Sequence, residues 1–276
     1  METIGFVGTG AMGTALLSRL QLARMPATAF DLVPEALERA KALGAESVVS
    51  AKAVAQKSTL IDVVVRSDQE VLDCMLGDEG ILEGASPGTL VLLHSTIRPT
   101  TTKQVAQAAA DKRVYVIDAC MTGVPSVARD GGLTFLVGGQ KALFNRAKPH
   151  LLRMGKDAVY MGPLGSGNVT KLIKNLVTAS EALIIYEAIQ IGRAAGIDYR
   201  VALELMKKTQ SEPVLNRWET RFDISGPELK FNCGANLYDK DVPLAADVGK
   251  NLGADIPITE ELAKLGIRLS SGKVSV

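Results

Sequence analysis

The chain has 276 residues, 47% of them hydrophobic, and its 31 Lys and Arg nearly balance 30 Asp and Glu for a formal net charge of +1. A chain of this length and composition can bury a sizeable core, as one large globular domain or two ordinary ones. Its basic residues are scattered, so it lacks the basic stripe that binds phosphate backbones, and we expect no nucleic-acid partner.

The three cysteines, Cys74, Cys120 and Cys233, are odd in number and far apart in the sequence. Their spacing argues against a disulfide framework and against paired zinc ligands, and it fits a reducing compartment. No basic and apolar leader opens the chain, and no apolar run reaches the ~18 residues of a membrane span. We therefore expect a cytoplasmic protein with no metal site and no membrane contact.

Short apolar runs alternate with amphipathic segments from the start of the chain to about Met161. The predicted strands are TIGFVG, ATAFD, TLIDVVV, TLVLLHS and RVYVIDA, and helices are predicted from Ala11, from Pro34 and after Pro99. Such alternation predicts right-handed crossovers and a largely parallel sheet, which is an α/β domain. Two later runs, LTFLVGG and DAVYMG, flank a helix from Gln140 and are expected to add strands at the edge of the sheet.

Beyond the segment GPLGSG, at residues 162–167, the strand-like runs stop and helical periodicity takes over. We predict helices over Asn168–Ala195, Tyr199–Lys208, Asn236–Leu252 and Thr259–Leu265, with a further segment around Trp218. The first of them would be ~40 Å long at ~1.5 Å per residue, enough to join two domains. The sequence thus predicts a first domain over residues 1–163 and an all-helical domain over residues 164–276.

The opening sequence GFVGTGAMG places Gly8, Gly10 and Gly13 between a predicted strand and a predicted helix. In a dinucleotide site, the first glycine permits the tight turn, the second lets backbone amides approach the pyrophosphate, and the third allows close helix–strand packing. The alternative is a turn that needs glycine for steric reasons alone. The strand–loop–helix context favours a Rossmann-type nucleotide site, whose loop and helix start also contain Thr9, Ala11 and Met12.

Asp31 ends the next predicted strand, 18 residues after Gly13. Its carboxylate can accept hydrogen bonds from ribose hydroxyls and would repel a 2′-phosphate, and Leu32 and Val33 offer no arginine to hold one. Asp31 can also cap the helix that begins near Pro34, a role compatible with binding ribose. The residues predict NAD as the cofactor, with NADP less favoured.

A bound nicotinamide implies hydride transfer, which requires a group that gives or takes a proton. In GSGNVTKLIKNLV, Asn168, Lys171 and Asn175 fall at i, i+3 and i+7 on an otherwise apolar helix. Partial burial would lower the pKa of Lys171, so that it exchanges a proton with an alcohol or carbonyl while Asn175 orients the substrate oxygen. The alternative is a solvated polar stripe.

The two histidines are weaker candidates for this chemistry. His150 lies in a predicted helix dotted with lysine and arginine, which is typical of a surface residue. His94 ends a predicted strand nearer the expected crevice, but its neighbours Ser95 and Thr96 are the better-placed polar groups.

Five motifs follow one another along the chain: GFVGTGAMG, HSTIRP, DACMTGV with GGLTFLVGG, GSGNVTKLIKNLV, and LYDKDV. In order and spacing they resemble the β-hydroxyacid dehydrogenase family, which includes 3-hydroxyisobutyrate dehydrogenase and tartronate semialdehyde reductase. The resemblance covers nearly the whole chain. It implies an NAD-binding domain, a helical domain like the C-terminal domain of 6-phosphogluconate dehydrogenase, a site in the cleft between them, a small carboxylate-bearing 3-hydroxy acid as substrate, and a homodimer or homotetramer.

The resemblance also implies roles for residues that contact the substrate. Lys171 matches the family's catalytic lysine, and Asn175 matches the asparagine one turn on that helps to bind the substrate. Thr122 and Gly123 lie where the family has a Ser-Gly-Gly loop that holds the substrate carboxylate, and Ser95 is placed with them.

Further residues are expected to contact the cofactor. Thr96 matches a threonine that lies near the nicotinamide, and Lys240 in DKD matches a lysine that reaches the cofactor from the helical domain. Val65 ends a predicted strand, and Arg66 follows it with Ser67 and Asp68 where the family commonly has an apolar-proline turn. Because strand carboxyl ends face the crevice, Arg66 can bind a cofactor phosphate or a second acidic group on the substrate. The alternative is a surface arginine paired with Asp68.

The segment DACMTGV departs from the family's DAPVSGG. Thr122 keeps the hydroxyl of the usual serine, whereas Val124 adds a side chain where a second glycine is usual and restricts left-handed backbone. We therefore expect a reshaped carboxylate pocket. Two rival functions stay open: an imine reductase, which shares the fold but usually lacks the lysine, and a non-catalytic NAD-binding redox sensor.

Overall fold

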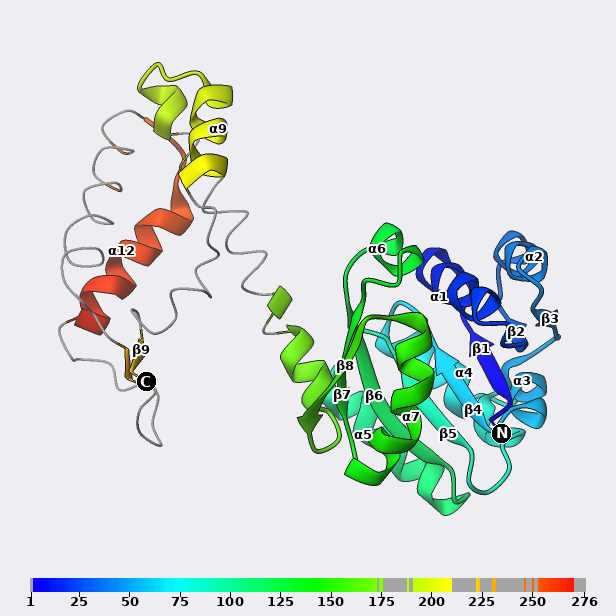
Figure 1. Cartoon of the computed structure of the whole chain (residues 1–276). Coiled ribbons are helices and arrows are strands. Elements are labelled where there is room, and N and C mark those ends of the chain that lie inside the picture. Colours follow the sequence, from blue (N-terminus) through cyan, green and yellow to red (C-terminus); the bar gives the residue numbers. More distant parts are fainter. Residues whose placement is uncertain are drawn as a thin grey trace. The chain divides into compact units, whose positions relative to one another are not determined.

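The computed structural model describes residues 2–172, 174–175, 188, 191–209, 222–223, 230–231, 246, 250 and 253–270. The chain divides into two compact units, Met1–Asn175 and Leu176–Val276, and each is described by itself (Figure 1). The helical residues 166–172 and 174–175, named the Lys171 helix below, belong to the first unit. The domain boundary expected between residues 163 and 164 stays a prediction.

An eight-stranded sheet in the order β3-β2-β1-β4-β5-β6-β7-β8 forms the centre of the first unit. Strands β1 to β6 pair in parallel, β7 runs antiparallel to β6, and β8 runs parallel to β7. The largely parallel sheet is confirmed, with LTFLVGG and DAVYMG at its edge. The strands are β1 (Ile4–Val7), β2 (Ala27–Phe30), β3 (Glu46–Ser47), β4 (Leu60–Val63), β5 (Leu90–Leu93), β6 (Tyr115–Thr122), β7 (Thr134–Gly138) and β8 (Asp157–Gly162).

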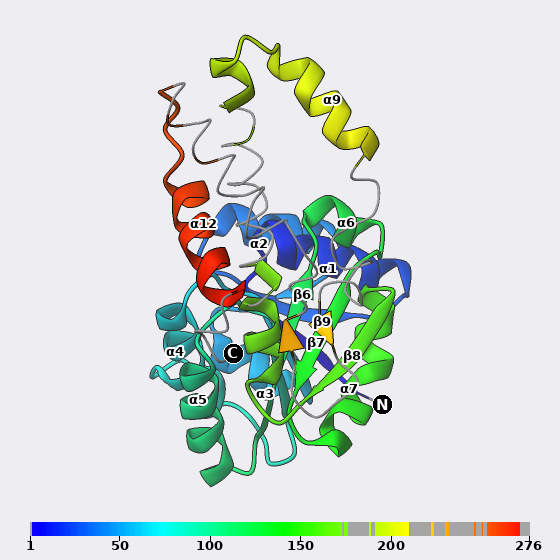
Figure 2. The ribbon, with the colours of Figure 1, turned by 90° about the vertical axis from the view of Figure 1, so that its left-hand side faces the viewer.

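Helices cover both faces of this sheet, as Figures 1 and 2 show from two directions. One face packs against α1 (Ala11–Leu22), α2 (Pro34–Ala42), α6 (Pro125–Arg129) and α7 (Lys141–Met154). The other packs against α3 (Ala51–Lys57), α4 (Asp68–Leu76), the 3₁₀ turn η1 (Ile81–Glu83) and α5 (Pro99–Asp111). This is the layer arrangement of a Rossmann-type domain.

Local sequence signals set where several of these helices begin. The Ser50 and Ser67 hydroxyls accept the backbone N–H groups of Ala53 and Glu70 and so cap α3 and α4. Helices α2, α5 and α6 each have proline in the first turn, where its missing N–H costs no hydrogen bond.

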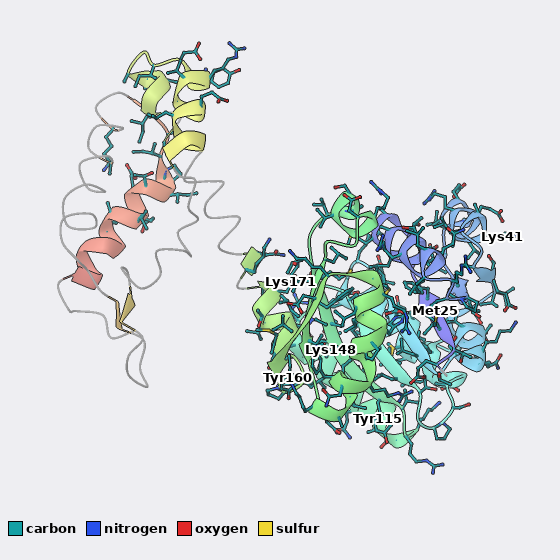
Figure 3. All side chains as sticks on the ribbon, viewed as in Figure 1. Met25, Lys41, Tyr115, Lys148, Tyr160 and Lys171 are labelled. Atoms are coloured by element: carbon teal, nitrogen blue, oxygen red, sulfur yellow. The ribbon has the colours of Figure 1, made fainter. Side chains whose placement is uncertain are left out.

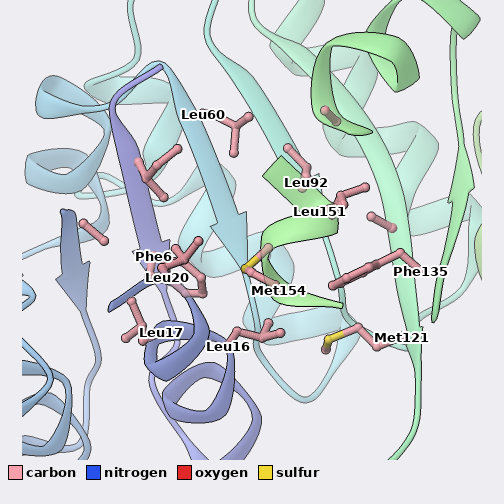
Figure 4. Close-up of a cluster of buried hydrophobic side chains, with 14 of the residues drawn as sticks. Phe6, Leu16, Leu17, Leu20, Leu60, Leu92, Met121, Phe135, Leu151 and Met154 are labelled. Atoms are coloured by element: carbon pink, nitrogen blue, oxygen red, sulfur yellow. The ribbon is translucent and has the colours of Figure 1, made fainter. Parts of the chain in front are cut away.

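The central strands are apolar on both sides because helices cover both faces. In β5, Leu92 belongs to the cluster under α1 and α7, whereas Val91 belongs to the cluster under α3, α4 and α5. Burying one such side chain stabilises the fold by about 1.5–3 kcal/mol. Against this background, Asp62 on β4 and Asp118 on β6 stand out as fully buried charges. Figure 4 shows the first cluster, with Phe6, Leu16, Leu17, Leu20, Leu60, Leu92, Met121, Phe135, Leu151 and Met154 labelled.

The strand order positions the predicted site. The sheet grows outward from β1 in one direction to β3, and the chain then returns to place β4 on the other side of β1. In such open sheets ligands bind beyond the carboxyl ends of the strands, at the point where the order reverses. The glycine loop after β1, Asp31 after β2, and the loops after β4 and β5 all lie at this end of the sheet.

The second unit contains α9 (Tyr199–Thr209) and α12 (Pro257–Ser270), where helices were predicted. It also contains β9 (Phe222–Asp223), antiparallel to β10 (Lys230–Phe231), a pair that the helical periodicity did not predict. Within the described ranges, none of the helices is long and apolar enough to cross a membrane. Lys240, Trp218 and most of the helices predicted over Asn168–Ala195 and Asn236–Leu252 lie outside the described residues.

Candidate active site

The loop after β1 leaves open space in front of helix α1. Gly8 has φ +93°, and a Cβ at this position would lie 2.3 Å from the Val64 carbonyl oxygen. At Gly13 a Cβ would lie 2.1 Å from the carbonyl oxygen of Gly8, so both positions require glycine. At Gly10, by contrast, a Cβ would meet nothing within 4 Å. The loop is therefore closely packed at Gly8 and Gly13 and has open space at Gly10.

The N-terminus of α1 opens onto this loop. Its N-cap is Gly10, which offers no side-chain cap, and its first turn contains no acidic residue. The first intrahelical bond runs from the Thr14 N–H to the Gly10 carbonyl at 2.9 Å, so the N–H groups of Ala11, Met12 and Gly13 have no acceptor within the helix. Uncapped N–H groups and the positive end of the helix dipole suit a bound pyrophosphate.

Asp31 is fixed beside the same loop. Its Oδ2 accepts hydrogen bonds from the Thr9 backbone N–H at 2.5 Å and from the Thr9 hydroxyl at 3.3 Å, and its Oδ1 accepts the Val33 N–H at 2.8 Å. No side chain caps α2, so Asp31 holds the loops after β1 and β2 instead of capping that helix. An ionised carboxylate has about four acceptor positions, which leaves capacity for ribose hydroxyls.

Ser95 joins the loops that follow β4 and β5. Its hydroxyl donates to the Val65 carbonyl at 2.7 Å and accepts the Val65 N–H at 3.3 Å. Ser95 itself is buried, whereas Thr96 beside it is exposed. The Ser95 hydroxyl is therefore hydrogen-bonded to the Val65 backbone, and Thr96 is the exposed residue of this loop.

Arg66 points into solvent, with 91% of its side chain exposed, and pairs with Glu70 at 2.9 Å. The alternative pairing with Asp68 is wrong. Asp68 stands in the first turn of α4, where it accepts hydrogen bonds from the Arg98 backbone N–H at 3.0 Å and the Thr101 hydroxyl at 2.5 Å. Glu70 instead lies four residues after Arg66 and meets its guanidinium.

The departure at Val124 has a different effect from the one expected. Val124 is the N-cap of α6 with φ −112° and ψ 169°, an extended conformation open to any residue. Gly123 takes the left-handed conformation instead, with φ +132°, and a Cβ there would lie 2.7 Å from Leu133 Cδ2. The expected backbone restriction at Val124 is therefore wrong, although the residue is 56% exposed beside the loop. Thr122 donates its hydroxyl to the Thr134 carbonyl at 3.2 Å.

Lys171 lies on the helix that follows β8 (Figure 3). Along this helix Asn168 is fully buried, Lys171 is half-buried and Asn175 is exposed. Burial, and next the charge of Lys174, lower the pKa of Lys171 from its ordinary value. The lysine is therefore neither a fully solvated surface group nor a buried structural one.

Both histidines are core residues around one carboxylate. His94 Nε2 donates to Asp62 Oδ1 at 2.7 Å, and His150 Nε2 donates to Asp62 Oδ2 at 2.8 Å. His94 Nδ1 lies 2.7 Å from the Ala119 carbonyl oxygen. Burial acts to raise the pKa of Asp62, but the two histidines outweigh it and lower that pKa to about 2.

The expectation of a surface position for His150 is wrong. His150 is 3% exposed and lies on the stripe of α7 that faces the sheet, with Ala147, Leu151 and Met154. The lysines and arginines of α7 occupy its other faces. Helical spacing from these apolar residues was the signal that could have placed His150 in the core.

Asp118 is a buried acidic residue that sequence reasoning missed. It is fully buried on β6, and its carboxylate accepts the backbone N–H groups of Gly165 and Asn168, at the start of the Lys171 helix. The available signal was a single charge in the apolar run RVYVIDA. Across the part of the chain that the structure describes, no cluster of three or more His, Cys, Asp or Glu side chains could hold a metal.

Two family models match the chain. Residues 3–162 match the NAD binding domain of 6-phosphogluconate dehydrogenase, and residues 165–273 match the NAD-binding of NADP-dependent 3-hydroxyisobutyrate dehydrogenase. Together the models span nearly all of the sequence.

Among curated relatives, an NAD-dependent L-serine dehydrogenase from Pseudomonas aeruginosa is 31% identical over 264 residues, or 94% of this chain and 89% of the relative. A solved 3-hydroxyisobutyrate dehydrogenase from Mycobacterium tuberculosis, with L-serine, is 25% identical with a TM-score of 0.71, covering 98% of this chain and 94% of the other. A variant imine reductase from Myxococcus stipitatus, in complex with NAD+, has a TM-score of 0.81 at 16% identity over 99% and 94% of the two chains, which shows a common fold alone. On the family models and the first relative, this chain belongs to the β-hydroxyacid dehydrogenase family.

Proposed function

We propose that this NAD-dependent hydroxyacid dehydrogenase oxidises the alcohol of a small 3-hydroxy acid, with Lys171 as the residue that takes up the hydroxyl proton. When bound, NAD accepts the hydride that leaves the alcohol carbon. The neutral amine of Lys171 takes the hydroxyl proton, and the product is a semialdehyde or keto acid. In the reverse direction the Lys171 ammonium returns this proton to the oxygen.

The half-buried position of Lys171 is the observation that carries the proposal. Partial burial lowers its pKa and so increases the fraction of neutral amine near working pH. In its charged form the same group stabilises negative charge that develops on the substrate oxygen. Asn175, one turn further along the exposed side, is proposed to donate its amide N–H to that oxygen.

The proposed carboxylate site lies at the end of β6. We assign substrate binding to Thr122 and the Gly123 backbone, beside the exposed residue Val124. The Thr122 hydroxyl would exchange its hydrogen bond to the Thr134 carbonyl for one to the substrate carboxylate. Because Val65 already engages the hydroxyl of Ser95, we propose that Ser95 contributes by fixing the loop that carries Thr96.

The cofactor assignment is supported by three features of the first unit. The open space at Gly10 and the uncapped start of α1 fit a pyrophosphate, and Asp31 fits a ribose with free hydroxyls. This favours NAD over NADP. The proposed cofactor residues are Gly8, Thr9, Gly10, Ala11, Met12, Gly13, Asp31, Val65, Arg66, Thr96 and Lys240.

A panel assay tests the function. NADH formation is measured at alkaline pH with 3-hydroxyisobutyrate, 3-hydroxypropionate, glycerate, tartronate, threonate and L-serine, with NAD and with NADP. We expect turnover with NAD on at least one acid and at least ~100-fold slower turnover in Lys171→Ala. The matched control is Lys174→Ala, which removes an exposed lysine from the same helix and should remain active.

Three outcomes would replace this proposal. Full turnover in a folded Lys171→Ala variant would remove Lys171 from the chemistry. Binding of NAD without turnover on the whole panel would favour a redox sensor, and reduction of cyclic imines would favour an imine reductase.

We further propose that the protein is a homodimer or homotetramer of the cytoplasm. The supporting observations are the family resemblance and the well-separated cysteines, of which Cys74 and Cys120 are free thiols. Size-exclusion chromatography with light scattering distinguishes a monomer of 29.2 kDa from both assemblies.

A further inference from the structure

The Lys171 helix begins on a buried carboxylate from another element. Asp118 Oδ1 accepts the Gly165 N–H at 2.7 Å, and its Oδ2 accepts the Asn168 N–H at 2.8 Å. A Cβ at Gly167 would lie 2.7 Å from Oδ2, so glycine at this position makes room for the contact. The Asp118 carboxylate thus caps the N-terminus of the helix, although Asp118 belongs to strand β6 and does not precede the helix directly in the sequence.

Asn168, in the first turn of the same helix, is tied to two further elements. Its Oδ1 accepts the hydroxyl hydrogen bond of Thr102, on α5, at 2.8 Å. Its Nδ2 donates to the Ser95 carbonyl at 3.4 Å and to Cys120 Sγ at 3.3 Å. One fully buried amide thus joins α5, the loop after β5 and β6.

Cys120 closes this network. Its thiol donates to the Ser95 carbonyl at 3.3 Å, so that carbonyl accepts hydrogen bonds from both Cys120 and Asn168. Burial raises the pKa of the Cys120 thiol to about 12, which keeps the group protonated and able to donate. Every member is buried, and buried polar networks of this kind hold their parts in one arrangement when all groups are satisfied.

We infer that Asp118 and Asn168 are positioning residues that set the place of the Lys171 amine relative to the loop of Ser95 and Thr96. The inference rests on the proposed function of Lys171. Asn168 lies one turn before Lys171, so a shift of the first turn moves the amine by a similar amount. A misplacement of about 1 Å can cost about 100-fold in rate. The hydrogen bond from Asn168 to the Ser95 carbonyl would therefore fix the distance between the Lys171 amine and the loop of Ser95 and Thr96.

A network that served stability alone would behave differently. Its loss would lower the melting temperature but leave the turnover and the pH profile of the folded protein unchanged. A positioning role predicts a slower chemical step and a changed environment for the Lys171 amine in protein that is still folded.

Thr102 supplies the test, because it touches Asn168 and has no assigned role in catalysis or binding. Thr102→Val removes the hydroxyl and keeps the volume, whereas Thr102→Ser keeps the hydroxyl. We expect Thr102→Val to lower kcat about tenfold, with an unchanged Kd for NADH and a larger deuterium isotope effect from substrate labelled at the alcohol carbon. Thr102→Ser should restore kcat to within about twofold. Asp118→Asn, which keeps the shape of the cap, should lower kcat further.

A second readout needs no substrate. Acetic anhydride labels neutral amines, so its rate of reaction with Lys171 as a function of pH, followed by mass spectrometry, reports the pKa of this amine. We expect the labelling curve to move to higher pH in Thr102→Val, because a loosened helix lets water reach the amine, and to return in Thr102→Ser.

The outcomes separate the inference from the function on which it rests. If Lys171→Ala is inactive while folded Thr102→Val keeps the wild-type kcat and labelling curve, the positioning role is overturned and the proposed function stands. A lower melting temperature with unchanged kcat and labelling leads to the same conclusion. If folded Lys171→Ala keeps full turnover, both are overturned.

Discussion

Two buried aspartates in neighbouring parts of one sheet are satisfied in opposite ways. Asp62 on β4 binds the side chains of His94 and His150, whereas Asp118 on β6 binds the backbone N–H groups at the start of the Lys171 helix. Both are fully buried. The first aspartate joins three side chains of the core, and the second joins the sheet to the start of a helix. The role of a buried aspartate in an apolar strand thus depends on the groups to which it is hydrogen-bonded.

The pKa values follow this difference. Histidine partners outweigh the effect of burial at Asp62 and lower its pKa to about 2. At Asp118 burial dominates and raises the pKa, although the hydrogen bonds from Gly165 and Asn168 act in the other direction. We therefore expect loss of Asp62 to affect mainly stability and loss of Asp118 to affect mainly turnover.

The largest effect is expected from Asp62→Ala. The substitution leaves His94 and His150 buried without their acceptor, and breaking a buried pair on one side costs about 3–5 kcal/mol. The free energy of unfolding in urea should fall by this amount, while kcat of the molecules that remain folded should stay within about twofold of wild type. A loss of turnover in folded Asp62→Ala, equal to that in Asp118→Asn, would end the distinction between the two aspartates.

Acid unfolding is the second test, with a smaller effect. The Asp62 pKa is about 2 in the folded protein against an ordinary value of 3.8, so its ionised form contributes about 2 kcal/mol of stability above pH ~4. This contribution should disappear as pH falls from about 4 to about 2. Asp62→Asn cannot titrate, so its stability should be flatter over that range.

The contribution of Asp118 to stability is expected to change with pH in the opposite direction. Because its pKa is raised in the folded protein, its contribution to stability is largest below its ordinary value of 3.8 and decreases as pH rises through the folded pKa. Asp118→Asn should remove this decrease. Urea unfolding of the wild type and of both asparagine variants between pH 2 and pH 7 gives the contribution of each aspartate as wild type minus variant. Contributions that change with pH in the same direction would contradict the assignment.

Sequence reasoning predicted the parts of this comparison that depend on local pattern. The strands that carry both aspartates, the glycine loop and the start of α1 follow from short-range periodicity and from the spacing of Gly8, Gly10 and Gly13. The two-residue strand β3 escaped prediction, because Glu46–Ser47 has no apolar alternation and is a strand only through its pairing with β2.

The hydrogen-bond partners of Asp62 and Asp118 could not be predicted from local sequence patterns. The Asp118 carboxylate meets residues 47 and 50 positions away, and Asp62 meets His150 at a separation of 88, so these contacts exist only once the sheet has formed. The partner of Arg66 likewise depends on structure that the sequence pattern does not show. Because α4 begins at Asp68, Glu70 is the acidic residue that pairs with Arg66. Residue type and spacing predicted Lys171 as a candidate, but not the buried groups that hold its helix.

The smallest expected effect comes from Lys174→Gln, which removes a positive charge near Lys171. The charge of Lys174 is the second cause, after burial, that lowers the pKa of Lys171. The two like charges repel each other, so removing the charge of Lys174 should raise the pKa of Lys171. Oxidation requires the neutral amine, and the rising limb of its pH profile should therefore move to higher pH. High salt screens the interaction of exposed charges, so the difference between wild type and Lys174→Gln should shrink at 1 M salt. An unchanged profile would show that the charge of Lys174 does not control the chemistry, and would leave burial as the main cause that lowers the pKa of Lys171. On the inference above, that burial depends on Asp118 and Asn168, which hold the start of the helix.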